Sequence, residues 1–212
     1  MHTSFLLLAD GRFPSGGHAH SGGLEAAVAR GRVADLDDLR AFLRGRLHTA
    51  GLVAAAFTAA ACARPDAVEV LEEELAARTP SPALRLAARR QGRSLGRAAA
   101  VVWPDADARR AAQPIALGLA AHAAGLTPEE AALIAAYHAI SGPASAAVRL
   151  LGLDPYQVNA LLAQLGAECD EVAREAASSA RGPVEDLPAA SAPLLDVSAE
   201  DHAAWEVRLF AS

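Results

Sequence analysis

The spacing of apolar residues is the feature that most restricts how this chain can fold. Between positions 35 and 61, apolar residues recur at three- and four-residue steps, at Leu36, Leu39, Leu43, Leu47, Ala50, Ala54 and Phe57. This spacing places them on one face of a long helix. Asp35 stands at the N-cap position and Asp38 falls in the first turn. Since no segment shows a convincing two-residue alternation, the sequence predicts an all-α fold.

Helix start signals precede several later segments. A Ser, Thr or Asp that precedes proline, or that is followed three residues later by glutamate, is typical of an N-cap. The predicted starts are Asp66 with Glu69, Ser81 with Pro82, Thr127 with Glu130 and Pro128, and Asp154 with Pro155. The helix that starts at Pro82 should end at Trp103-Pro104. Gly142-Pro143 should kink or break the helix that contains it, because proline loses a backbone hydrogen bond and clashes with the preceding turn.

The remaining pattern sets the domain organisation. Asp154 is predicted to open one last long helix with a buried stripe at Val158, Leu161, Leu162, Leu165, Val172 and Ala176. Residues 1–180 are expected to form a single-domain helical bundle. Pro, Gly and Ser interrupt the periodicity in residues 181–212, which predicts an extended C-terminal tail with a short helix near 198–207. Two short apolar runs, residues 5–9 and 100–103, fit a buried helical turn or a short strand equally well.

Composition and charge exclude several classes of function. Apolar residues make up 52% of the chain and aromatic residues only 4%, so alanine and leucine dominate, which favours helix. The net charge of −6 argues against binding to a nucleic-acid backbone. All 19 basic residues are arginine, which removes a P-loop lysine and a Schiff-base lysine. We therefore do not expect this chain to hydrolyse ATP or GTP by itself.

The cysteines and the hydropathy predict a cytoplasmic protein. Cys62 and Cys169 are far apart and too few for a thiolate zinc site or a disulfide framework, so we interpret them as structural thiols in a reducing compartment. The N-terminal run "MHTSFLLLADGRF" lacks the basic region and the length of a signal peptide. We also expect no apolar run that approaches the roughly 18 residues of a membrane span.

The loop "FPSGGHAHSGGLE", residues 13–25, is the strongest candidate for a functional site. Its histidines, His18 and His20, could share a metal ion in a loop. A third ligand would have to come from elsewhere, from Asp10, Glu25, His48, His122 or His138, and none has the spacing of a known metal motif. The favoured interpretation is therefore a pair of loop histidines that bind backbone groups.

Two further chemistries are available to this loop. "AHSGG" formally fits a nucleophile elbow at Ser21, but an elbow follows a buried strand, and "GRFPSGGH" cannot form one. The glycines could also turn backbone N–H groups toward an anion at a helix N-terminus. If Gly22 is the N-cap, Glu25 falls in the first turn and repels an incoming phosphate, so this hypothesis is weakened.

Charged residues elsewhere indicate surfaces rather than catalysis. "EEE" at 72–74 is typical of a solvated face. "RRQGRSLGR", residues 89–97, is a dense arginine cluster, either an exposed basic face or a docking patch for an acidic partner. Arg149 follows the Gly-Pro pair in an apolar setting, so we expect a buried arginine with a partner, either in a structural ion pair or as an interface anchor. No triad, carboxylate pair or cofactor loop emerges.

These motifs together resemble the UreF family of urease accessory proteins. The similarity runs from "LADGRFPSGGHAHSGGLEAAVARGRV" through "DLDDLRAFLRGRL", "ARRQGRSLGR" and "SGPASAAVRLLGL" to the terminal "WEVRLFAS". It therefore spans nearly the whole chain, and the two end motifs together are specific. The chain departs from the family after Arg149, where "RLLGLDPYQ" replaces the usual Pro-Leu-Gly-Gln run.

The resemblance implies a role that is not catalytic. It implies an all-α homodimer that bridges the scaffold protein UreD (also called UreH) and the GTPase UreG, in a complex that docks on apo-urease. Nickel and GTP would be handled by the partners, with no cofactor intrinsic to this chain, and UreF would gate the coupling of GTP hydrolysis to nickel insertion. Neither nucleic acid nor a membrane is an expected partner.

The resemblance also assigns partner-binding residues. The N-terminal signature matches His20, Ser21, Gly22, Gly23, Leu24 and Glu25. The arginine before the family's usual Pro-Leu-Gly-Gln run matches Arg149, and the tail motif matches Arg208, Leu209 and Phe210. Two alternatives remain open from the residues alone. One is a serine hydrolase that uses Ser21, and the other is a nickel-binding metallochaperone that uses His18 and His20.

Overall fold

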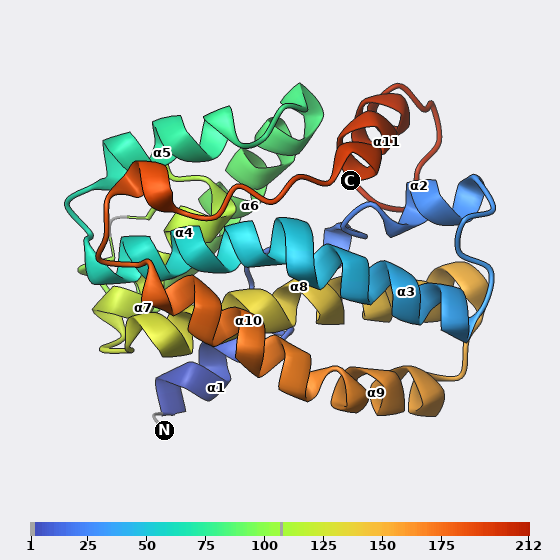
Figure 1. Cartoon of the computed structure of the whole chain (residues 1–212), viewed down its shortest axis with the longest axis horizontal. Coiled ribbons are helices and arrows are strands. Elements are labelled where there is room, and N and C mark those ends of the chain that lie inside the picture. The colour runs from blue at the N-terminus through green and yellow to red at the C-terminus, as the bar shows by residue number, and fades with distance from the viewer. Residues whose placement is uncertain (1–2, 107) are drawn as a thin grey trace.

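The computed structural model describes residues 3–106 and 108–212, and this part of the chain folds into helices with no strand (Figure 1). The all-α prediction is therefore confirmed. The α-helices are α1 Thr3–Ala9, α2 Leu24–Ala29, α3 Leu36–Arg46, α4 Leu52–Ala63, α5 Val68–Ala77, α6 Pro82–Val102, α7 Gln113–Ala123, α8 Pro128–Leu151, α9 Pro155–Gln164, α10 Gly166–Ser178 and α11 Pro193–Ala203. Leu47–Gly51 forms a π-helical turn between α3 and α4, and Gly17–Ala19 and Val184–Asp186 form short 3-10 turns.

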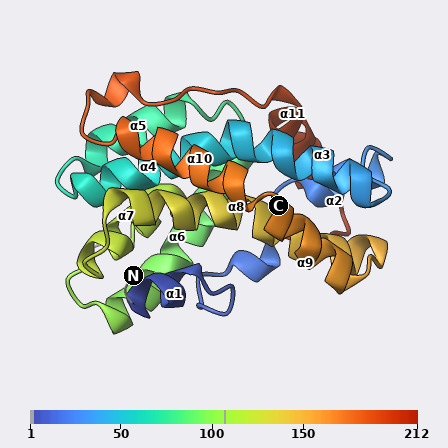
Figure 2. The ribbon, with the colours of Figure 1, turned by 60° about the horizontal axis from the view of Figure 1, so that its bottom comes forward.

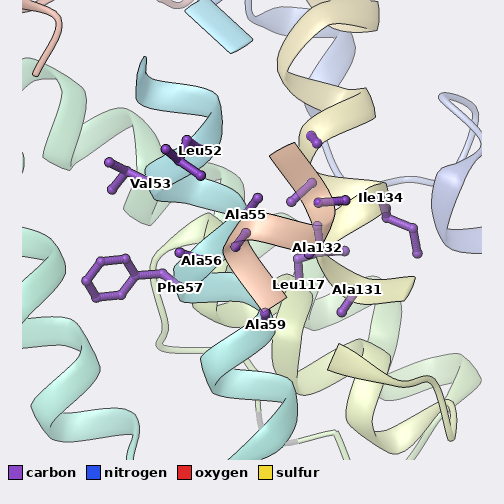
Figure 3. Packing of buried hydrophobic residues seen from close by; sticks show 14 of the residues in the cluster. Leu52, Val53, Ala55, Ala56, Phe57, Ala59, Leu117, Ala131, Ala132 and Ile134 are labelled. Carbon is purple, nitrogen blue, oxygen red and sulfur yellow. The ribbon is translucent and has the colours of Figure 1, made fainter. Parts of the chain in front are cut away.

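The core lies where α4 packs against α7, α8 and α10. Alanines dominate it, with larger side chains such as Phe57, Leu117 and Ile134 between them (Figure 3). Small side chains let the helix backbones approach closely. At Gly118 of α7 an added Cβ would stand 2.3 Å from the main-chain oxygen of Thr58 on α4, so only glycine fits at this crossing. Each fully buried leucine contributes about 1.5–3 kcal/mol to folding.

Most of the predicted helix caps are confirmed. The side chains of Asp35, Ser81 and Asp154 accept backbone hydrogen bonds at the starts of α3, α6 and α9. Thr127 and Glu130 form the complete capping box of α8. The cap at Asp66 is wrong, because a backbone hydrogen bond closes a turn between Arg64 and Ala67 first. Helix α5 therefore starts at Val68, with no side-chain cap.

The long helices differ from the prediction at two places. The segment from Leu36 to Ala63 continues through the π-helical turn, with Leu39, Leu43, Leu47 and Phe57 buried and Leu36, Ala50 and Ala54 only partly buried. The single helix predicted after Asp154 is wrong, since α9 and α10 meet at the buried Leu165. The division lets α9 pack on α3 and α8 while α10 packs on α4 and α8.

Helix α8 runs without a break through Pro143, so of the predicted kink or break, the break is wrong. The proline has no N–H to donate to the carbonyl oxygen of Ala139, four residues earlier. Arg46 supplies the missing donor, because its Nε lies 3.0 Å from that oxygen. A side chain from α3 thus completes the hydrogen bonding of a helix that the sequence alone marks as interrupted.

The C-terminal segment is more ordered than an extended tail. After α10 it crosses the bundle to α11, which packs on α6 and α2, as Figure 1 shows. Arg78 of the α5 C-cap holds this crossing by hydrogen bonds to the carbonyl oxygens of Glu185 and Leu187. The helix predicted at 198–207 is shifted, because Pro193 starts α11 earlier and the helix ends at Ala203.

The two short apolar runs are helical, but the burial expected for them is only partly correct. Leu8 of α1 is buried, whereas Leu6 and Leu7 of the same helix and Val101 and Val102 at the end of α6 are exposed. Helix α1 packs on α8, and Figure 2 shows it in dark blue beside the N-terminus.

The expectation that no apolar run approaches the length of a membrane span holds only in part, because two helices reach it by length and composition alone. The segments 36–63 and 128–151 both pass that test. In the structure 67% and 61% of their apolar windows are buried inside the bundle, as expected for core helices.

Candidate functional site

The N-terminal signature, residues 19–25, lies against the end of the C-terminal tail, residues 207–212; we call this arrangement the signature–tail contact. The N–H of Ser21 donates to the main-chain oxygen of Ser212 at 2.7 Å, and the N–H of Ala211 donates to the carbonyl oxygen of Ala19 at 2.7 Å. The hydroxyl of Ser21 donates to the same Ser212 oxygen at 2.9 Å. Nδ1 of His20 lies 2.6 Å from the Ser212 hydroxyl.

Glu25 is the buried centre of the signature–tail contact. Its carboxylate accepts the N–H groups of Leu209 at 2.8 Å and Phe210 at 3.0 Å. Nε2 of His202, at the end of α11, lies 2.8 Å from Oε2. Burial by itself would raise the pKa of Glu25, but the hydrogen bonds from Leu209, His202 and Phe210 outweigh it, so the pKa is lowered. The side chain therefore stays ionised and faces the tail.

Two glycines of the signature are required by geometry. Gly22 and Gly23 have φ values of 62° and 91°, in the left-handed region that side chains disfavour. A Cβ on Gly22 would lie 3.0 Å from Cγ of Pro143 and 3.1 Å from Cζ of Arg46. Gly23, rather than Gly22, is the N-cap of α2. Glu25 does lie in the first turn of α2, as expected, but it faces inward and not toward an incoming anion.

Arg149 joins the signature–tail contact from α8. The prediction of a buried arginine is wrong, since the side chain is exposed. Its guanidinium stacks over the ring of Phe210, 4.4 Å from the centroid, and it donates to the carbonyl oxygen of His18 at 3.1 Å. Cation–π stacking explains why a charged side chain lies in this apolar setting.

The remaining tail residues divide by exposure. Phe210 is buried under Arg149, whereas Leu209 is 75% exposed although its N–H is bound to Glu25. Arg208 is exposed as well. Leu24 is fully buried in the core behind the signature. The structure therefore brings together all the residues that the resemblance assigned, some as supports and some at the surface.

Arg46 is a member of the site that sequence reasoning missed. It lies beside Gly22, binds the Ala139 carbonyl and directly precedes the π-helical turn. Burial lowers its pKa to about 10. The signal was present in the sequence, because a proline inside a helix frees the carbonyl oxygen four residues earlier and so requires a donor from elsewhere.

The structure does not support the metal site proposed for His18 and His20. In residues 3–106 and 108–212, no three or more metal-binding side chains lie close enough to hold a metal ion. The proposed third ligands lie with other partners. Glu25 binds His202, His48 lies 2.8 Å from Glu168, His122 lies 2.9 Å from the Cys62 carbonyl, and His138 lies 3.4 Å from that of Ala9. Asp10 accepts the N–H of Arg12.

The geometry of Ser21 is structural. Its side chain is fully buried, and its hydroxyl bridges the Ser212 oxygen and the N–H of Glu25.

The two cysteines are free thiols and are buried. Burial raises the pKa of Cys62 to about 11 and that of Cys169 to about 12, so both remain thiols at neutral pH.

Comparison of the whole chain with known proteins identifies its family. The UreF family model matches residues 33–166. The urease accessory protein UreF of Mycobacterium sp. (strain JLS) is 47% identical over 214 residues, which cover 99% of this chain and 98% of the relative. UreF of Mycolicibacterium vanbaalenii is 46% identical with the same coverage of both chains. UreF of Mycobacterium tuberculosis (strain ATCC 25618 / H37Rv) is 43% identical over 93% of this chain and 92% of the relative.

These relatives extend over both halves of the signature–tail contact, since the alignments cover almost all of the chain from end to end. The similarity therefore includes the two segments that form the contact. The chain belongs to the UreF family of urease accessory proteins.

Proposed function

We propose that this chain bridges the scaffold protein UreD/UreH and the GTPase UreG in the complex that inserts nickel into apo-urease. In this role the chain acts as a cytoplasmic homodimer and gates the coupling between GTP hydrolysis and nickel insertion. Nickel and GTP are handled by the partners. UreF proteins are accessory proteins rather than enzymes, which is consistent with such a bridging role.

One observation carries the proposal: the two end motifs of the family meet in the signature–tail contact. Ser21, Glu25 and Phe210 are buried there and hold the tail, while Arg208 and Leu209 stay exposed on it. Arginine is enriched among the residues that contribute most to binding at interfaces, and the exposed leucine offers apolar surface that a partner can bury. We therefore propose Arg208 and Leu209 as direct partner contacts, with the buried residues as their support.

Binding of purified partners tests this division. Leu209→Ser removes the exposed apolar side chain without touching the main-chain hydrogen bond to Glu25, so we expect a stable fold with binding to UreD or UreG weakened by about tenfold or more. Tyr156→Ala, which removes another exposed large side chain on α9, serves as the matched control. Wild-type chain that binds neither partner at low salt would contradict the proposal, and so would full binding by the Leu209 variant.

A further inference from the structure

Helix α6 presents a row of arginines on its exposed face. Every exposed side chain between positions 83 and 100 is an arginine except Leu86, and the arginines are Arg89, Arg90, Arg93 and Arg97. Arg89, Arg93 and Arg97 are four residues apart, so they stand one above another along about 12 Å of helix. The whole helix contains neither aspartate nor glutamate.

None of these four arginines forms an ion pair with a carboxylate of the described residues, although the chain carries more acidic than basic residues. Some exposed arginines elsewhere in the chain do, as Arg30, Arg40 and Arg44 show. Like charges four residues apart on a helix repel one another. The row therefore works against the stability of the free chain.

The fold prevents α6 from turning this face inward. On the opposite side, Gly92 and Gly96 lie against the backbone of residues 108–112, where an added Cβ would come within 2.5 Å or less of a carbonyl oxygen. Leu95 and Ala99 are buried on the same side. These close contacts set the rotation of α6, and the arginines are consequently held outward in a fixed register.

The positive charge of Arg90, a member of the row, acts on a neighbouring side chain. Arg90 lies at the edge of a hollow of about 80 Å³ between α6 and α11, together with Arg208 and the exposed Leu86. Burial lowers the pKa of His20 in the same hollow, and the charge of Arg90 lowers it further. Arg89 lines a neighbouring cavity of about 220 Å³.

We propose that the arginine row of α6 is a docking surface for an acidic segment of a partner protein in the urease assembly. Guanidinium groups bind carboxylates in a bidentate geometry, and a one-turn spacing matches carboxylates four residues apart on a partner helix. Arginine is enriched at protein interfaces, whereas lysine is depleted there. The excess negative charge of the rest of the chain disfavours extended polyanions such as nucleic acid. The choice of partners rests on the proposed function.

A triple variant tests the row: Arg89→Gln, Arg93→Gln and Arg97→Gln. It is compared in the full chain with a control that neutralises three exposed arginines outside α6: Arg40→Gln, Arg174→Gln and Arg181→Gln. Equilibrium binding to purified UreD, UreG and apo-urease is measured between about 50 and about 200 mM salt. We expect the α6 variant to bind one of these partners about tenfold or more weakly, with a flatter salt dependence. The control variant should bind as the wild type does.

Thermal unfolding distinguishes a role of the row in partner binding from a role in the stability of the fold. Because the substitutions remove like-charge repulsion, the α6 variant should melt at the same temperature as the wild type or higher while its binding falls. A row that merely stabilised the fold would lower the melting temperature instead, and this outcome would overturn the inference.

If the arginine row binds something other than a urease protein, the same variants show it. If the α6 variant loses binding to duplex DNA, to anionic vesicles or to its own second copy while it keeps the urease proteins, the inference is overturned. Wild-type binding to a urease protein that the α6 variant retains at full strength overturns the inference and leaves the proposed function intact. Wild-type chain that binds none of the three proteins removes both.

Discussion

At the scale of single residues, the site depends on a buried carboxylate. The two oxygens of Glu25 accept three donors from the tail and from α11, which lie 177 to 185 residues away in the sequence. Hydrogen bonds to an ionised acceptor are roughly twice as strong as those between neutral groups. One side chain in the signature therefore holds the end of the chain.

Replacing Glu25 by glutamine should release the tail. Glutamine offers one oxygen where the carboxylate offers two, so at least one of the three donors is left facing an amide N–H₂ group. We expect a loss of about 2 kcal/mol or more in the free energy of unfolding, measured by urea denaturation. Faster hydrogen exchange at residues 205–212 should accompany it. Glu73→Gln, on the exposed face of α5, is the control and should change neither quantity; unchanged exchange in the Glu25 variant would contradict this account.

At the scale of elements, α3 and α8 are joined by a hydrogen bond that replaces the one Pro143 cannot make. Arg46 donates to the Ala139 carbonyl that Pro143 leaves free, and its guanidinium carbon lies against Gly22 of the signature. The π-helical turn follows directly, with Gly51 close to Ala139. The side chain that precedes the π-helical turn thus supplies the donor that Pro143 lacks in α8.

A double-mutant cycle tests this compensation. Arg46→Met should cost about 1–3 kcal/mol in the wild-type background, because the Ala139 carbonyl loses its donor. In a Pro143→Ala background the new N–H at position 143 binds that carbonyl, so the same substitution should cost less. We expect a coupling of about 1 kcal/mol from urea unfolding of the four proteins. Equal costs in the two backgrounds would show that the residues act independently.

At the scale of the whole molecule, stability should fall as the solution is acidified. Burial lowers the pKa values of His20 and His138 from the usual 6.5, so the unfolded chain binds more protons below that pH than the folded chain does. The free energy of unfolding should decrease as pH falls below about 6.5. Glu25, whose pKa is lowered from 4.5, adds stability that is present above that value and is lost as pH falls through the folded pKa.

Urea unfolding between about pH 4 and pH 8 measures this dependence. His138→Gln removes one titrating group, so its unfolding free energy should vary less between about pH 5 and 6.5. A wild-type stability that is flat across this range would contradict the proposed proton linkage.

Much of the fold could be predicted because it depends on local rules. The spacing of Leu39, Leu43 and Leu47 and the caps at Ser81 and Thr127 act within one or two turns of helix, so they are visible in the sequence. The Asp66 cap and the continuous helix through Leu165 were wrong where a competing turn or the packing of neighbours prevailed. The candidate residues came from resemblance to a family, and no local pattern related their two groups to each other.

The amino-acid pattern was sufficient to predict that this chain is helical, where most of its helices begin, and which family it resembles. That the signature faces the tail, that Arg46 completes α8, and that the arginines of α6 point outward together became visible only in the three-dimensional fold. The difference lies in the sequence distance over which each interaction acts. Helix periodicity and capping act over a few residues, whereas the contacts of Arg46 with α8 and of the signature with the tail join residues 93 to 192 positions apart. They arise only when the alanine-rich core brings their helices together.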